Sequence, residues 1–177
     1  MTITFQDGEL RQLLREHVQR TQPELLAHGH DQTLTYPDWL GTGHKRDIEL
    51  PSGISLTLHR YRLHQNLVQA CAAEQADCFE FVFNLTTHSQ YNEGPVFCDR
   101  HAHLLAPEGQ DSRWREFANQ DYLAVDIHLD PPLLKALSEG HSTVPKLLQN
   151  LLNGEYTFPF IDPVAITPAM QTALWQM

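Results

Sequence analysis

Apolar residues follow two different spacings along this chain, and the change between them marks where strands replace a helix. Near the start the spacing is helical, with a stripe of side chains at Leu10, Leu13, Leu14 and either His17 or Val18. Asp7 is the expected N-cap, and the helix is expected to end near Arg20 because Pro23 disfavours helical backbone at the residue before it. Residues 1–40 are therefore predicted to form an N-terminal helix and a loop. From this loop two aromatic side chains are expected to dock on the core, Tyr36 and Trp39.

Within residues 41–130 the period becomes two, which is typical of strands that differ between their two faces. Apolar side chains alternate along three runs and share one face: Ile54, Leu56, Leu58, Phe79, Phe81, Phe83, Leu123, Val125 and Ile127. The opposite face of the same runs is more polar: Ser55, Thr57, His59, Glu80, Asn84, Asp126 and His128. Several short strands separated by Gly, Pro and Asn turns indicate an antiparallel sandwich or barrel.

Residues 131–177 are predicted to be helical. Asp130 is an N-cap followed by proline at the first helical position, and Thr167 opens a last helix in the same way. That last helix has no stop signal before the chain ends, so a longer natural chain is expected. One apolar seam of it packs on the barrel or forms a helix–helix dimer contact through Met170, Leu174 and Met177.

Charge and composition narrow the classes of function. The 177 residues contain 22 acidic and 12 basic side chains, for a formal charge of −10, which argues against a nucleic-acid-binding surface on this chain. No run of 18 apolar residues is present, so no membrane partner is expected. The N-terminus lacks the features of a secretory signal, and three cysteines form an odd, sparse set. These features predict a protein of the reducing cytoplasm.

A histidine pair on a predicted strand is the main candidate for metal chemistry. His101 and His103 share a strand face, and Glu108 follows at the spacing HxHx4E. Two imidazoles and a carboxylate can hold a divalent metal ion, and Cys98 is a further candidate ligand. The spacing resembles the first metal motif of cupin barrels, although the second cupin motif, PxGxxH, has no match in the chain. The alternative is a pair of ordinary hydrogen-bonded or surface histidines.

Three further polar residues on predicted strands are candidates for ligand binding. Asp126 and His128 share a strand face and can line a polar cavity, as can His59 on another strand. The alternative is a polar face turned to solvent. The chain contains no GxSxG, GxGxxG or P-loop motif, so a serine hydrolase and these nucleotide-binding folds find no support.

Three segments resemble the N-terminal regulatory region of AraC-type transcription regulators. They are GTGHKRDIELPSGISLTLHRYRLHQNL, AVDIHLDPPLL and TPAMQTALWQM, and the resemblance covers about residues 41–177. The branch is the one that includes the pyochelin-uptake regulator and cyanobacterial-type relatives. This resemblance implies a cupin-like antiparallel β-barrel, preceded by an N-terminal helix and followed by C-terminal helices. It also implies a helix-turn-helix DNA-binding domain that follows this chain.

The expected function is therefore an effector-sensing domain of a transcription regulator, and not an enzyme. The resemblance implies that the effector is iron or an iron-siderophore-type ligand, that the domain can form a homodimer, and that DNA is bound through the missing C-terminal domain. Two alternatives stay open. One is a metal-dependent cupin enzyme that uses His101, His103 and Glu108, and the other is an iron–sulfur or redox sensor that uses Cys98 and nearby histidines.

Overall fold

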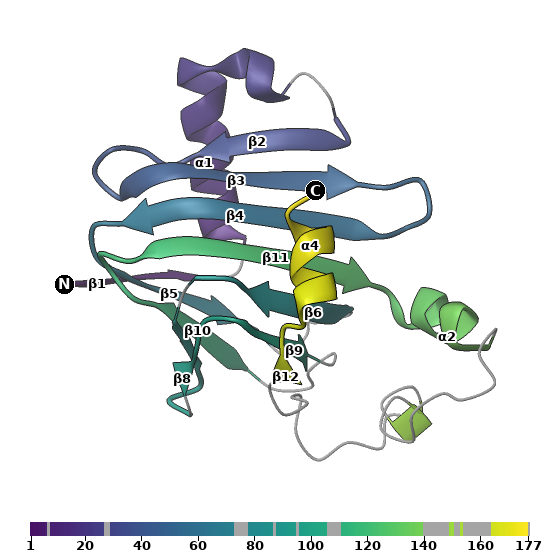
Figure 1. Ribbon diagram of the computed structural model, residues 1–177. Helices are drawn as coiled ribbons and strands as arrows, with labels where there is room; N and C mark the ends of the chain where they lie inside the picture. The colour runs from purple at the N-terminus through teal and green to yellow at the C-terminus, as the bar shows by residue number, and fades with distance from the viewer. Residues whose placement is uncertain are drawn as a thin grey trace.

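The computed structural model describes residues 1–6, 8–26, 29–72, 78–86, 88–94, 96–105, 111–139, 149–150, 153 and 164–176. Its strands form two β-sheets that pack against each other, with helix α1 (Glu9–Thr21) packed between them at one side (Figure 1). Helix α2 (Pro131–Glu139) follows the last long strand, and helix α4 (Pro168–Leu174) lies near the C-terminal end. The predicted mainly β architecture with helices near both ends is confirmed.

The larger sheet has seven strands, in the order β12 (Val164–Ala165), β9 (His101–Leu105), β6 (Phe79–Asn84), β11 (Asp121–Leu129), β4 (Ser55–Leu63), β3 (Gly41–Glu49) and β2 (Asp31–Thr35). The smaller sheet has five, in the order β1 (Thr2–Gln6), β5 (Asn66–Cys71), β10 (Ser112–Glu116), β7 (Ser89–Tyr91) and β8 (Val96–Phe97). Neighbouring strands are antiparallel except β1 and β5, which are parallel.

The expectation of one antiparallel barrel needs correction. Within the described residues, the edge strands of one sheet do not pair with those of the other, so the sheets do not close into a single barrel. The sheet that contains β1 is also mixed, because β1 precedes helix α1 and the chain returns to pair with it in the same direction at β5. No helix in the described part of the chain is long and apolar enough to cross a membrane.

The N-terminal helix has the predicted apolar stripe but a different cap. Leu10, Leu14 and Val18 are buried, as the spacing predicts. The N-cap is Gly8, at φ 75°, a left-handed conformation that glycine adopts without the strain that a Cβ would add. Asp7, the expected cap, lies outside the described residues. The helix ends at Thr21, close to the predicted end.

The stretch predicted as a loop contains regular structure. It holds a short 3-10 helix, η1 (Pro23–Leu26), and strand β2, whose sequence DQTLT shows no clear alternation. Strand β2 forms because it pairs with β3 along its whole length. This tertiary contact cannot be predicted from the sequence of β2 itself. Tyr36 is buried as predicted, but the expectation for Trp39 is wrong, since 54% of this side chain is exposed.

Two apolar clusters stabilise opposite ends of the molecule. One lies between α1, the N-terminal strands and the end of the larger sheet, and includes Leu14, Leu34 and Tyr61. The other lies under α2, where Leu133 and Leu134 pack with Phe79. The predicted Asp130 cap of α2 is confirmed, because Asp130 Oδ1 accepts a hydrogen bond from the Leu133 backbone N–H at 3.1 Å. The predicted Thr167 cap of α4 is likewise confirmed at Met170 N.

The α1 cluster generates a stability prediction. Leu14 is fully buried, so Leu14→Ala should lower the free energy of unfolding by about 2–5 kcal/mol through lost contacts and a cavity. The matched control is Leu137→Ala in α2, where the side chain is 50% exposed and the expected change is about 0.5 kcal/mol or less. Urea unfolding followed by circular dichroism measures both. Equal losses in the two variants would show that α1 does not pack as described.

Candidate functional site

The inner face of the seven-stranded sheet, which faces the five-stranded sheet, is polar at its centre. Pairing places Lys45 of β3 opposite His59 of β4, and Asp47 opposite Thr57. Thr57 in turn lies opposite Asp126 of β11. The predicted alternation along these strands is therefore correct, but the polar face is turned into the molecule. Part of the apolar face is covered by α2.

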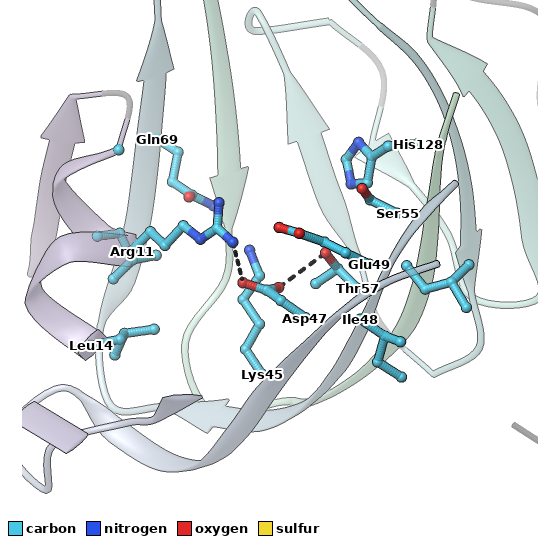
Figure 2. Close-up of a pocket in the computed structure, with 13 residues that line it drawn as sticks. Arg11, Leu14, Lys45, Asp47, Ile48, Glu49, Ser55, Thr57, Gln69 and His128 are labelled. Carbon is cyan, nitrogen blue, oxygen red and sulfur yellow. Dashed lines mark hydrogen bonds and ion pairs between the residues drawn. The ribbon is translucent and has the colours of Figure 1, made fainter. Parts of the chain in front are cut away.

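A cavity of about 440 Å³ opens between α1 and this polar face (Figure 2). Most of the residues that line it are polar: Arg11, Lys45, Asp47, Glu49, Ser55, Thr57, Gln69 and His128. Arg11 reaches from α1 to Asp47, with Nη2 and Oδ2 3.2 Å apart, and Thr57 donates a hydrogen bond to the same carboxylate at 3.1 Å. The cavity is within the usual size range for a small-molecule site and contains charges of both signs.

His59 and Asp126 form a buried pair beside this cavity. His59 Nε2 donates to Asp126 Oδ2 at 2.5 Å, and both side chains are largely buried. Burial alone would raise the pKa of Asp126, but the neighbouring His59 imidazole outweighs it and lowers that pKa. The His59 ring also meets the rings of Tyr61 and Tyr122 edge-on. These contacts fix the imidazole against an aromatic wall on one side and a carboxylate on the other.

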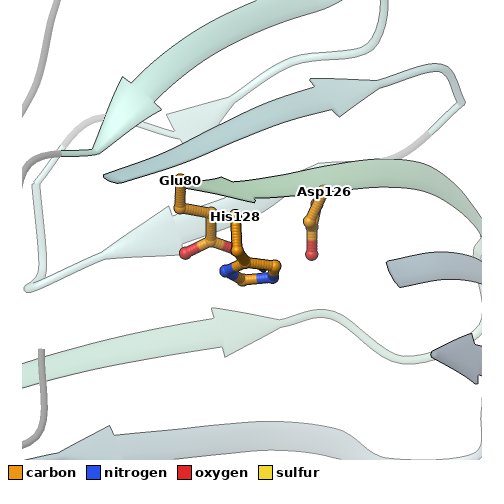
Figure 3. Close-up of side chains that lie close together, drawn as sticks. All are labelled: Glu80, Asp126 and His128. Atoms are coloured by element: carbon orange, nitrogen blue, oxygen red, sulfur yellow. Dashed lines mark ion pairs between the residues drawn. The ribbon is translucent and has the colours of Figure 1, made fainter. Parts of the chain in front are cut away.

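Glu80 completes a second polar group that sequence reasoning missed. One ligand atom from each of Glu80, Asp126 and His128 lies within 4.8 Å of the others (Figure 3). Burial, and next the Asp126 carboxylate, raise the pKa of Glu80 to about 8. Burial lowers the pKa of His128. The available signal was that Glu80 lies on the polar face of a strand of phenylalanines, but its partner strand could not be read from the sequence.

The structure thus brings together the three residues predicted to bind a ligand. His59 pairs with Asp126, and Asp126 lies beside His128, which lines the cavity.

The structure describes only three of the four predicted metal ligands on and around β9. His103 is 3% exposed, and its ring stacks on Phe97 at 4.5 Å between ring centres, while burial lowers its pKa to about 4. His101 is half-buried and its Nδ1 donates to the Asp99 carbonyl at 2.8 Å. Cys98 is exposed, and Glu108 lies outside the described residues. The set of four stays a prediction.

Several buried polar atoms between the sheets lack hydrogen-bond partners among the residues that the structure describes. They are the side-chain amide of Asn84, the hydroxyl of Ser89, Oε2 of Glu116, Nδ1 of His59 and Oδ1 of Asp126. An unpaired buried polar group costs about 1–3 kcal/mol, so native interiors satisfy such groups with water or with a ligand. The interior therefore contains hydrogen-bond donors and acceptors that water or a polar ligand can satisfy.

One protein family matches most of the chain. The profile of the family described as "Regulatory protein PchR N-terminal domain" matches residues 42–177. No curated protein sequence matches the chain significantly.

Matching solved structures include a globulin, an oxalate decarboxylase and a vicilin. They are the 7S globulin of Momordica charantia (10% identity, TM-score 0.38, 75% of this chain and 47% of that chain), the oxalate decarboxylase of Bacillus subtilis (9%, 0.38, 80% and 42%) and the vicilin of Corylus avellana (12%, 0.37, 83% and 50%). The chain thus spans about half the length, or less, of these solved chains.

The buried His103 predicts how stability depends on pH. The folded protein protonates His103 near pH 4, whereas an unfolded histidine titrates near pH 6.5. Between these values the unfolded chain binds the extra proton, so His103 makes stability fall as pH falls, by about 3 kcal/mol at most. In His103→Phe, which preserves a ring beside Phe97, this loss should disappear. Urea unfolding at pH 7, 5.5 and 4.5 measures the difference from the unsubstituted protein.

The control is His30→Phe, because the His30 side chain is 87% exposed. This variant should retain the pH dependence of the unsubstituted protein. An unchanged loss of stability in His103→Phe would contradict the burial assigned to His103.

Proposed function

Since the chain belongs to the family of regulatory protein PchR N-terminal domains, we propose that it is the effector-sensing domain of an AraC-type transcription regulator. The family match over residues 42–177 is the observation that carries this proposal. In this function the domain is a sensor and not an enzyme, acts in the cytoplasm, and reaches DNA through a helix-turn-helix domain outside this chain.

The effector that we propose is iron or an iron-siderophore-type ligand bound in the cavity between α1 and the larger sheet. The mixed lining supports a polar, chelate-like molecule: Arg11 and Lys45 can face anionic oxygens, while Ser55 and Gln69 offer hydrogen bonds. A ligand acts only if it binds one arrangement of the domain more tightly than another. Helix α1 forms one wall of the cavity, so a change in its position would change the affinity for the ligand.

The dimer is a separate part of the proposal. Met170 and Leu174 are half-buried residues four apart on α4, so they share one face of that helix. Met177, the third residue of the predicted seam, lies outside the described residues. We assign this face to the contact between two copies of the domain.

Binding of a ferric chelate tests the effector proposal. In Trp39→Phe/Trp175→Phe protein the remaining Trp114 reports on the interior, because it lies opposite Gln69, which lines the cavity. Titration with ferric siderophores, including ferric pyochelin, should quench this fluorescence to saturation. Ser55→Phe should weaken binding at least about tenfold, equal to about 1.4 kcal/mol, because a ring fills the cavity.

The matched control is Arg60→Phe, which adds the same ring at an exposed position of the same strand. It should bind as well as the parent protein. If no ferric chelate quenches Trp114, or if Ser55→Phe and Arg60→Phe bind equally, the effector site assigned to this cavity is wrong.

Sedimentation velocity tests the dimer contact. Met170→Glu/Leu174→Glu should shift the protein from dimer to monomer, since two carboxylates cannot be buried unpaired in an apolar contact. Ala169→Glu/Thr172→Glu adds the same charge at exposed positions of α4 and should leave the dimer intact. A dimer that resists the first pair of substitutions would place the contact elsewhere.

A further inference from the structure

We propose that Glu80, Asp126 and His128 form a binding site for a divalent first-row transition metal ion beside the cavity, which His128 lines. This site is separate from the histidine pair predicted on β9. The inference deepens the proposed function, and rests on it for its regulatory meaning, because it names side chains that would bind an effector metal directly.

The two strands that carry these residues place them on one face. Asp126 and His128 are two apart on β11, so their side chains point to the same side of the sheet. Pairing with β6 places Glu80 directly opposite His128. Figure 3 shows the resulting cluster of two carboxylates and one imidazole. Both strands are interior members of the sheet, so the backbone beneath the cluster is held on both sides.

The spacing is close to that of a metal site. First-row ions hold oxygen and nitrogen ligands at about 2.0–2.2 Å, so two atoms bound to one ion lie within roughly 4.4 Å of each other. The three candidate atoms lie within 4.8 Å, and Glu80 Oε1 is 4.0 Å from His128 Nε2. Small side-chain rotations suffice to bring all three to an ion. Both Glu80 and His128 retain about 30% exposure, which leaves them room to move and leaves the ion a path of entry.

Asp126 provides an independent indication of a ligand. The residue is 91% buried, and apart from the neighbouring Glu80 carboxyl group its Oδ1 has no hydrogen-bond partner in the described structure. Its other oxygen is held by His59, which orients the carboxylate as outer-shell groups do in metal sites. Cys78 contacts the Nδ1 side of His128 at 3.8 Å, which leaves Nε2 facing Glu80. A cation at this point would bind this oxygen and balance the negative charge of the cluster.

The ligand chemistry and the surrounding charge define the class of ion. Carboxylate oxygen and imidazole nitrogen suit Mn²⁺, Fe²⁺ and Zn²⁺, whereas Cu⁺ prefers sulfur ligands. Lys45 faces the same interior from β3 and acts on the charge of all three residues. It is therefore a competitor for the carboxylates, and its removal should favour the metal.

Manganese titration tests the site, because free Mn²⁺ gives an electron paramagnetic resonance signal that weakens when the ion binds. The full chain should bind one equivalent. Glu80→Gln and His128→Gln should each weaken binding at least about tenfold, since loss of a ligand costs more than loss of an outer-shell partner. Lys45→Met should tighten it. Thermal unfolding by circular dichroism identifies any variant that fails to fold.

The matched controls are His101→Gln and His103→Gln, which should retain one equivalent of Mn²⁺. Absence of saturable binding by the parent protein, or equal binding by folded Glu80→Gln and His128→Gln, would overturn the inference. If only the two control variants lose binding, the inference is wrong and the metal is bound by His101 and His103 of β9. If ferric chelates bind and bare Mn²⁺ does not, this inference is wrong while the proposed function stands. If Mn²⁺ binds and no chelate does, the metal site stands and the chelate effector is wrong.

Discussion

The His59–Asp126 pair is the contact on which the arrangement of the interior depends. Burying a carboxylate costs several kcal/mol unless a partner compensates, and a hydrogen-bonded imidazole at 2.5 Å is such a partner. The pair joins β4 to β11, the two strands at the centre of the larger sheet. Because His59 compensates the buried charge of Asp126, the same face of the sheet can hold further polar side chains.

This polar centre also explains why the apolar clusters lie at the ends of the molecule. Apolar contacts gather where α1 meets the ends of the sheets, and where α2 covers the far end of the outer face. The space between remains lined by charges, hydroxyls and amides. The apolar clusters at the two ends therefore supply much of the stability, while the polar interior between them can hold a ligand.

The sequence predicted the alternation of the central strands correctly because alternation is a local property. The same reasoning placed Asp126 and His128 on one face and found both helix caps, at Asp130 and Thr167. It could not tell which face is the interior, since that depends on which surfaces α1 and α2 cover. Glu80 was missed for a related reason: its importance comes from pairing of β6 with β11, between residues more than forty positions apart.

Other misses have the same origin in long-range contacts. Strand β2 has little pattern of its own and is formed by its pairing with β3, while the parallel pairing of β1 with β5 joins segments separated by more than fifty residues. The helix spacing near the N-terminus needed no such partner, so its buried stripe was predicted well. Local periodicity thus predicted which residues share a face, and tertiary pairing decided which faces meet.

A regulatory domain must convert occupancy of its interior into a change at its surface, and α1 is placed to do so. Its apolar stripe anchors it to the end of the sheets, while Arg11 reaches into the cavity to Asp47. That ion pair is half-exposed on the arginine side, so it contributes little to stability and a ligand can replace it at low cost. An anionic ligand that takes over Arg11 releases Asp47, whereas a cation near Asp126 leaves the pair in place. The two kinds of effector would therefore act on α1 differently, although they enter the same interior.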